Sequence, residues 1–372
     1  MKFMCDKDTF AKKIFNANDF KNAKSSISIT SNVYLKTTQD QLIIKTTDNN
    51  MGYISYLPVI TIEEGESIVS CTKLGDILKA FTNIENIILE TNKDILNIYP
   101  KDSSKHFNFE LKINDVNDFP TLESPDKKDF FKLSAISFLD MIKHTQFAAS
   151  KDESRHYLCG HFFQKIEGGI AMVTTDGKRL SFIKTRCEDT VPSFPSVTIP
   201  TKFISIISKI IEDSGEIEIA LEKNLISIKL PDETFFYSSL IEVGFPVYNR
   251  IIPQEQKYKC ILNLKDTVDA INRVKLFVLD KSNRIFLNIS SNKLTLLSDV
   301  TEQGQAVEEL DCDYNGEDVK IAVNYNFFLD PLKNMDVDYF SINFDGPNKT
   351  LKLLPESNDK SYLHIVMPIQ PK

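Results

Sequence analysis

The stretch RHYLCGHFFQKIEGGIAMVTTDGKRL, residues 155–180, predicts a β-hairpin followed by a tight polar turn. The run from Leu158 to Phe163 has strand character, and Glu167-Gly168-Gly169 supplies the glycines that a turn favours. Ile170 to Val173 then returns as a second strand, and Asp176-Gly177 predicts a bend or bulge after it. The stretch therefore indicates antiparallel sheet in the middle of the chain.

The order of elements around this hairpin occurs three times. Each time a short amphipathic helix is followed by strands, by a second helix with apolar residues at i, i+3, i+4 or i+7, and by further strands. Three kinds of landmark recur in this order at intervals of about 125 residues, which is the usual size of a domain. They are aspartates after a strand (Asp48, Asp176, Asp299), helix N-caps (Thr72, Thr201, Asn326) and closing prolines (Pro120, Pro246, Pro368). Pro331 interrupts the last helix, which is therefore expected to be kinked or to begin later.

A chain of 372 residues is too long for one hydrophobic core, so the repeat predicts three domains, at residues 1–128, 129–253 and 254–372. An antiparallel sheet with its helices on one face is the economical way to bury two helices and many alternating strands, and this is an α+β fold. Copies joined end to end leave sheet edges exposed, and exposed edges pair with other strands. We therefore expect an arc of three domains to close with a second chain.

The composition excludes several classes of protein. The chain has a globular composition, with 42% apolar and 26% charged residues, and its six cysteines are scattered without a CxxC pair, which argues against structural zinc and a disulfide framework. No signal peptide and no apolar run of about 18 residues is evident, so we expect a soluble, cytoplasmic protein without a membrane partner. GxxxxGK[ST], GxGxxG and HExxH are absent, so neither a cofactor nor a metal is expected.

The net charge of −8 argues against a nucleic-acid partner if the charge is evenly spread, because affinity for DNA comes largely from Lys and Arg. The distribution is uneven, however. Acidic residues gather at 63–66 and 308–313, whereas lysines from Lys7 to Lys24 surround the first helix. Charge alone leaves open both an ordinary acidic surface and a basic face on an acidic protein.

Five segments, taken in this order and at these spacings, resemble the bacterial DNA sliding clamp, the β subunit of the replicative DNA polymerase. They are His144-Thr-Gln-Phe147, Arg155-His-Tyr-Leu-Cys-Gly160, Thr175-Asp-Gly-Lys-Arg-Leu180, Phe245-Pro-Val-Tyr-Asn-Arg-Ile-Ile-Pro253 and Met367-Pro368. The resemblance implies clamp-type domains with sheets outside and two helices each inside, and a head-to-tail homodimer whose six domains form a ring around duplex DNA. It also implies that the ring gives processivity by tethering the replicative polymerase, and that the clamp loader and repair proteins bind it through short peptide motifs. Because a ring prevents escape, its contacts with the DNA backbone need only be weak and independent of sequence.

The resemblance also assigns roles to residues. DNA contacts are implied for Lys24, Arg155, His156 and Tyr157, with His156 in place of the more usual tyrosine. The pocket for partner peptides is implied for Leu158, Thr175, Gly177, Lys178, Arg179, Leu180, Pro246, Arg250, Ile251, Phe327, Ile365, Met367 and Pro368. The dimer interface is implied for Phe107 and Phe109 on one face and for Leu276 and Phe277 on the other. Lys178, Phe327 and the tail from Ile369 to Lys372 depart from the family's pattern, which leaves the preference among partners open.

Two other functions compete with a clamp. An enzyme would use Asp176, Lys178 and Arg179 for phosphate chemistry, or Cys159 as nucleophile with His161 as base. No third residue that would orient this base is evident. A repeat-built scaffold that binds peptides and never encloses DNA is the second alternative. Retention on circular DNA, with release on linearisation, separates the scaffold from a clamp.

Overall fold

The computed structural model of the chain describes residues 1–21, 29–102, 104, 106–123, 128–187, 191–279, 283–357 and 361–370. The chain forms two compact units, Met1–Ile136 with Lys202–Leu240 and Ser137–Thr201 with Ile241–Lys372. Each unit contains its own sheets and its own core. Within the described ranges, no helix is both long enough and apolar enough to cross a membrane.

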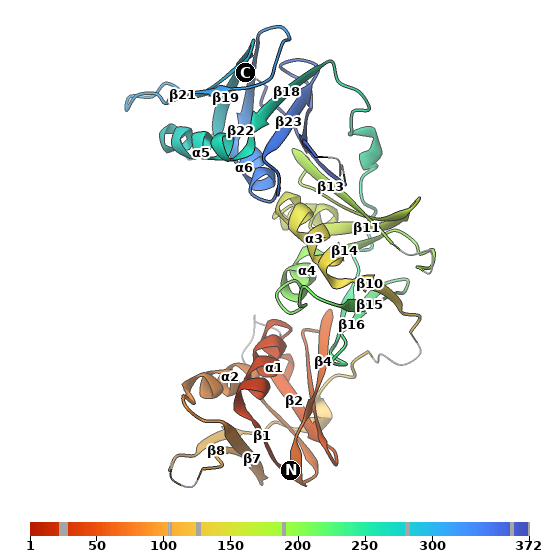
Figure 1. Cartoon of the computed structure of the whole chain (residues 1–372). Coiled ribbons are helices and arrows are strands. Elements are labelled where there is room, and N and C mark those ends of the chain that lie inside the picture. Colours follow the sequence, from red (N-terminus) through yellow and green to blue (C-terminus); the bar gives the residue numbers. More distant parts are fainter. Residues whose placement is uncertain are drawn as a thin grey trace. The chain divides into compact units, whose positions relative to one another are not determined.

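One order of elements, which we call a module, occurs three times (Figure 1). The first module consists of β1 (Lys2–Asp6), α1 (Lys7–Asp19), β2 (Asn32–Thr37), β3 (Gln41–Thr47), β4 (Met51–Pro58), β5 (Ile60–Glu63), β6 (Gly65–Ser70), α2 (Cys71–Ala80), β7 (Asn86–Asn92), β8 (Ile95–Pro100) and β9 (Phe109–Lys112). The second consists of β10 (Phe131–Ser134), α3 (Ala135–Thr145), β11 (Gly160–Ile166), β12 (Gly169–Thr175), β13 (Arg179–Arg186), β14 (Val197–Pro200), α4 (Thr201–Ile207), β15 (Glu216–Leu221), β16 (Leu225–Lys229) and β17 (Phe235–Ser239). The third consists of β18 (Tyr258–Asn263), α5 (Leu264–Val274), β19 (Arg284–Ser290), β20 (Lys293–Ser298), β21 (Val307–Asp311), β22 (Val319–Asn324), α6 (Tyr325–Leu332), β23 (Tyr339–Phe344), β24 (Leu351–Pro355) and β25 (Tyr362–Val366). The predicted threefold repeat is confirmed, and only β5 has no counterpart among the described strands of the other two modules.

The helices of a module begin directly at the end of a strand. Asp6 and Asn263 are the N-caps of α1 and α5, because their side-chain oxygens accept hydrogen bonds from Thr9 N at 2.7 Å and Asp266 N at 3.0 Å. Asp and Asn favour this position because their short side chains reach the free N–H groups of the first turn. A strand therefore ends and a helix begins within one residue.

The predicted caps of the second helices are wrong by a residue or two. Ser70, not Thr72, caps α2, and Asn324, not Asn326, caps α6 through a bond from Asn326 N of 2.9 Å. Thr201 is itself the first residue of α4, and its hydroxyl has no partner among the described residues. Pro331 does not move the start of α6, since it lies in the last turn of that helix.

Two sheets of eight strands each join neighbouring modules. In the first unit the strand order is β10-β15-β16-β17-β4-β3-β2-β6, and in the second it is β14-β11-β12-β13-β25-β24-β23-β18. The antiparallel pair β17–β4 joins the second module to the first, and the antiparallel pair β13–β25 joins the third module to the second. We call these pairs the first and the second junction.

Two smaller sheets complete the units, with the orders β5-β1-β7-β8-β9 and β21-β20-β19-β22. Helices cover one face of these layers, and α1 packs beside α2 in the first unit as α5 packs beside α6 in the second (Figure 1). Each module therefore has two helices, and the prediction of an α+β fold with antiparallel sheets is confirmed.

The aspartate landmark is correct in two modules and wrong in the third. Asp48 Oδ1 accepts from Met51 N at 2.8 Å, and Asp176 Oδ1 accepts from Arg179 N at 3.0 Å, so the same side chain closes the same turn. In the third module the strand pairing places Val300, not Asp299, at the equivalent position. Asp299 instead forms an ion pair with Arg284 at 2.7 Å.

Candidate functional site

The turn between β12 and β13 is fixed by its own polar side chains. Thr175 Oγ1 donates to Arg179 O at 2.6 Å and accepts from Gly177 N at 3.1 Å. Gly177 has φ +86°, a backbone conformation that favours glycine. The predicted bend at Asp176-Gly177 is confirmed, and it presents the following residues at the start of β13.

Arg179 links this turn to helix α6. Its Nε donates to Asp176 Oδ2 at 3.0 Å, and its Nη1 donates to Asp330 Oδ2 at 2.6 Å. The guanidinium also lies 4.8 Å from the ring centre of Phe327, within the range of a cation–π contact. The side chain is largely buried, and its charge lies between two carboxylates and the rings of Phe327 and Phe147, the second at 5.9 Å.

The second junction brings the end of the chain to the same turn. Leu180 lies opposite Ile365 and Arg179 opposite Val366 in the β13–β25 pair. Met367 N donates to Lys178 O at 2.9 Å, so the strand pairing continues for one residue beyond β25. Residues that are far apart in the sequence therefore form one wall.

An apolar cluster lies under this wall. Its buried members are Val173, Leu180, Tyr248 and Ile365, and Phe162, Phe182, Phe245, Ile252 and Leu363 pack against them half-buried. Around this cluster Val247, Ile251 and Met367 expose large apolar side chains to solvent. A buried apolar floor with an exposed apolar rim and a few fixed polar groups suits an apolar side chain of a ligand.

The predicted pocket residues are mostly brought together in this one unit. Thr175, Gly177, Lys178, Arg179 and Leu180 form the turn and strand, and Ile365, Met367 and Pro368 run beside them. Arg250 is the last residue of the short helix Tyr248–Arg250, Pro246 lies two residues before this helix and Ile251 directly follows it. Phe327 contacts Arg179. Leu158 is buried but is not a member of the apolar cluster.

Several residues of this surface were not predicted, and two of them, Asp330 and Tyr248, make side-chain hydrogen bonds within it. Asp330 holds Arg179 from helix α6, and no local pattern in the sequence marks it. Tyr248 is the buried centre of the cluster, and its hydroxyl accepts a hydrogen bond from Gln164 Nε2. Tyr248 lies inside the segment 245–253 that carries the resemblance, so this segment contained the signal.

The three described residues predicted to touch DNA lie on one short segment, η4 (Glu153–Leu158). His156 is exposed and Tyr157 is half-buried. Arg155 donates from Nη1 to Asp176 O at 2.8 Å and from Nε to Asp152 Oδ2 at 3.1 Å. Arg155 therefore connects this segment to the β12–β13 turn, while Lys24 lies outside the described residues.

The four residues predicted at the dimer interface are exposed in the single chain. Phe107 and Phe109 pack around Phe81, with ring centres 4.9 and 5.4 Å from it, so the first face is a compact aromatic group. Only Phe109 of the two lies in strand β9. Leu276 and Phe277 belong to η6 (Lys275–Phe277), which directly follows α5.

The proposed pair of Cys159 and His161 is not formed. The Cys159 thiol contacts the carbonyls of Asp152 and Arg155, and burial raises its pKa. His161 is completely buried on β11, and burial lowers its pKa to about 3. A neutral thiol without a base is a poor nucleophile.

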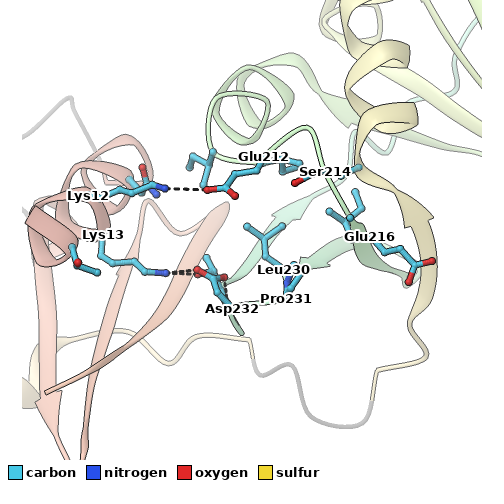
Figure 2. A pocket seen from close by; sticks show the side chains of 16 residues that line it. Lys12, Lys13, Glu212, Ser214, Glu216, Leu230, Pro231 and Asp232 are labelled. Atoms are coloured by element: carbon cyan, nitrogen blue, oxygen red, sulfur yellow. Dashed lines mark hydrogen bonds and ion pairs between the residues drawn. The ribbon is translucent and has the colours of Figure 1, made fainter.

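A cavity of about 490 Å³ lies in the first unit, and none of the described residues that were predicted as site residues lines it (Figure 2). Two ion pairs cross it, from Lys12 Nζ to Glu212 Oε1 at 3.2 Å and from Lys13 Nζ to Asp232 Oδ2 at 2.6 Å. Burial raises the pKa of Asp232, but the bonds from Lys13 and Thr234 outweigh it and leave this pKa below its usual value. The charged groups of the cavity are thus already paired within the first unit.

The tripled module and its edge-to-edge junctions define a repeat protein of the clamp type. Three family models match in succession: the N-terminal domain of the DNA polymerase III beta subunit at residues 1–123, its central domain at 132–247 and its C-terminal domain at 249–370. The chain therefore belongs to the DNA polymerase III beta subunit family, and the resemblance inferred from the five segments is confirmed.

Similar proteins agree over the full length. The beta sliding clamp of Treponema pallidum (strain Nichols) is 33% identical over 374 residues, covering 100% of both chains, and that of Rickettsia felis is 26% identical over 383 residues with the same coverage. Among solved structures, the DNA polymerase III subunit beta of Bartonella birtlesii bound to griselimycin has a TM-score of 0.93 at 25% identity, with 100% of both chains covered. The Borrelia burgdorferi subunit, solved with a natural product, has a TM-score of 0.92 at 24% identity, covering 100% of this chain and 99% of that chain, and shows the shared fold.

Proposed function

We propose that two copies of this chain close head to tail into a ring around duplex DNA and act as a sliding clamp. One observation carries the proposal. The chain has three modules but only two internal junctions, and among the described strands β9 pairs only with β8, and β21 only with β20. A free sheet edge attracts another strand. In a head-to-tail pair of chains, β9 of each copy can pair with β21 of the other, and these two contacts leave no β9 or β21 edge unpaired.

A closed ring resolves the conflict between an acidic chain and a nucleic-acid partner. Within the described residues, the α-helices α1 to α6 together carry a small excess of basic over acidic residues, although the whole chain has a net charge of −8. Weak contacts with the DNA backbone carry no sequence information and leave the ring free to slide. Arg155, His156, Tyr157 and Lys24 are the residues we propose to make such contacts.

The surface around Tyr248 is the proposed site for short peptide motifs of the replicative polymerase, the clamp loader and repair proteins. The buried floor and the exposed rim residues Val247, Ile251 and Met367 fit an aliphatic and an aromatic anchor. Motifs of this kind bind with about micromolar affinity, or about 8 kcal/mol, which permits one partner to replace another. The griselimycin-bound relatives support the view that clamps of this family hold ligands.

The remaining expectations follow from this role. The domains are proposed at residues 1–128, 129–253 and 254–372, and the protein is proposed to tether enzymes in the cytoplasm without catalysing a reaction itself. The dimer interface is proposed to consist of Phe107 and Phe109 of one copy against Leu276 and Phe277 of the other.

A topological assay tests the proposal. The protein is loaded with a clamp loader on a nicked circular plasmid, and its retention is measured at high salt before and after linearisation, alongside its mass in solution. A clamp has the mass of a dimer and stays on the circle but leaves the linear form. Equal dissociation from both forms would favour the scaffold that binds peptides without enclosing DNA.

A further inference from the structure

We propose that the cavity of the first unit binds a small neutral molecule that has one aromatic ring and one hydroxyl or amide group. We call it the α1 cavity, because residues of α1 line it together with residues of the segments 210–217 and 230–234. The proposal depends neither on the ring nor on the peptide-binding surface. It rests on a comparison of the two junctions within the chain.

Phe236 and His364 occupy equivalent positions in these junctions. At the same separation after each of them, a backbone N–H donates to a carbonyl that stands at the same position before a second helix. These bonds join Ile241 N to Thr198 O at 2.9 Å in the second module and Ile369 N to Ala322 O at 2.7 Å in the third. An aromatic residue that follows a first helix packs on each position, with ring centres 5.5 Å apart for Phe20 and Phe236 and 5.4 Å apart for Phe147 and His364.

The partner strands agree with this correspondence. Phe236 and His364 lie opposite Tyr53 and Ser181, respectively. These two partners follow, at the same separation, the aspartates that close the same turn in the first and second modules. The two junctions therefore share one register.

The second junction has two stacked rings in its next layer. Tyr362 stands two residues before His364, so both side chains lie on the same face of β25. The ring of His144, from α3, has its centre 4.2 Å from that of Tyr362, and both side chains are buried. An imidazole and a phenol thus fill the space between the first helix and the junction strand.

The first junction carries small side chains at the same two places. Asn16 stands at the same position in α1 as His144 in α3, and Thr234 corresponds to Tyr362 through the shared register. Asn16 and Thr234 both line the α1 cavity, whose volume is about 490 Å³ (Figure 2). The cavity therefore lies where the second junction holds two rings, and its volume is within the range of about 300–1,000 Å³ that is common for small-molecule sites.

The walls of the α1 cavity are apolar and come from the second module. They consist of Ile210, Ile211, Ile217, Leu230 and Pro231. Figure 2 shows Leu230 and Pro231 across the cavity from the lysines of α1. Aliphatic walls of this kind suit the faces of a flat ring, because they bury it without competing for hydrogen bonds.

The charged residues of the cavity favour a neutral molecule. Each described charged residue that lines the cavity has a partner of opposite charge. The ion pairs are Lys12 with Glu212 at 3.2 Å, Lys13 with Asp232 at 2.6 Å and Glu216 with Lys132 at 3.1 Å. A charged molecule would lose hydration and meet only groups whose charge is already compensated.

One end of the cavity is polar. The Asn16 amide can donate and accept hydrogen bonds there. The hydroxyl of Tyr53 lies beside Asn16 and Ser55, is completely buried and has no hydrogen-bond partner among the described residues. Burial raises the pKa of this hydroxyl, so it keeps its proton. Because unpaired buried polar groups cost free energy, this end favours a hydroxyl or an amide on the bound ring.

A molecule in this place contacts both modules at once. Thr9 and Asn16 belong to the first module, and Ile217 and Leu230 belong to the second. Binding therefore stabilises the first junction, as the His144–Tyr362 stack does for the second.

Methyl NMR on the whole chain, with ¹³C-labelled isoleucine δ1 methyl groups, tests the proposal. The probe is p-cresol, which has the ring and hydroxyl of a tyrosine side chain. Ile210, Ile211 and Ile217 report on the α1 cavity, and Ile365 reports on the proposed peptide-binding surface. We expect saturable ring-current shifts at the three cavity isoleucines, with a dissociation constant of about 1 mM or tighter.

Two variants make the test specific. Asn16→His with Thr234→Tyr rebuilds the stack of the second junction and should weaken p-cresol binding at the cavity isoleucines by about tenfold or more. Asn18→His is the matched control, since it makes the same change on α1 at a residue that does not line the cavity. Toluene, which lacks the hydroxyl, should bind about tenfold more weakly than p-cresol.

Three results would overturn the proposal: shifts that grow without saturation, shifts at Ile365 alone, and equal affinity in the parent and in Asn16→His with Thr234→Tyr. Toluene binding as tightly as p-cresol would overturn the assigned polar end. The methyl spectrum and circular dichroism verify the fold of each variant. If the double variant does not fold, Asn16→His alone decides by the same criterion, because it narrows the cavity at that end.

Discussion

Removing the apolar pair at the end of α5 should convert the dimer into folded monomers. Leu276 is 77% exposed and Phe277 is 40% exposed in the single chain, so these fractions are available for burial in a dimer. At about 1.5–3 kcal/mol for each fully buried side chain, the exposed parts together contribute about 2–3 kcal/mol per junction. The ring has two such junctions, so Leu276→Ala with Phe277→Ala should cost about 4–6 kcal/mol, or about 10³- to 10⁴-fold in the dissociation constant.

The assay is sedimentation velocity across nanomolar to micromolar concentration, with far-UV circular dichroism to verify folding. The control is Ile60→Ala with Ile62→Ala, which removes a comparable exposed apolar pair on β5, outside the proposed junction. We expect the control to remain dimeric while the test variant sediments as a monomer. Equal dimer stability in both variants would refute the assignment of the junction.

Three further outcomes follow from individual contacts. Arg179→Ala should weaken the binding of a polymerase-derived peptide by about tenfold or more in fluorescence titrations, because it leaves Asp330 and Phe327 without their cation. Lys184→Ala, an exposed lysine further along β13 and outside the proposed site, should change this binding little. His364 is buried at the second junction, and burial together with the nearby His144 lowers its pKa from 6.5 to about 3, so the folded state favours the neutral imidazole. Its stabilising effect is complete above about pH 6.5 and is lost as the pH falls toward 3, which should reduce the free energy of unfolding by about 2 kcal/mol at pH 5 in urea titrations. A His364→Gln variant whose free energy of unfolding has the same pH slope would contradict this. Gly52→Ala should destabilise the first junction by about 1–3 kcal/mol, since a Cβ at this position would lie 2.1 Å from Tyr237 Cε1. The control Gly244→Ala should have little effect, because no atom lies within 4 Å of a Cβ there. Equal melting temperatures of the two variants would contradict the close packing of Tyr237 on Gly52.

Burial of His364 at the second junction costs folding free energy, and the sequence pattern does not reveal this cost. His364 Nδ1 lies 2.8 Å from Ser181 Oγ across the second junction, but its Nε2 has no partner among the described residues. Burial of an imidazole favours its neutral form, which gives the junction its sensitivity to acid. The proposed peptide-binding surface uses residues of the same two strands, β13 and β25, so it should become disordered when acid destabilises this junction.

The sequence by itself determined the tripled order of elements, the hairpin at residues 160–175 and the polar turn at Asp176-Gly177. These features depend on local chemistry: alternating apolar residues, glycines at turns and side chains that bond to their own backbone. The family segments were also visible, because each is a short run of neighbouring residues. Where only local spacing decided, as at Thr72 and Asp299, the prediction missed by one or two residues, since a cap or a turn position is defined by a hydrogen bond and not by residue type.

The tertiary structure alone decided which distant residues meet. The bond from Arg179 to Asp330, the packing of Tyr237 on Gly52 and the shared register of the two junctions join segments that lie far apart in the chain. No local pattern encodes such contacts, because their free energy comes from burying surfaces that face each other only after the sheets have formed. For the same reason, only the strand pairing shows that β9 and β21 each lie at the end of a sheet.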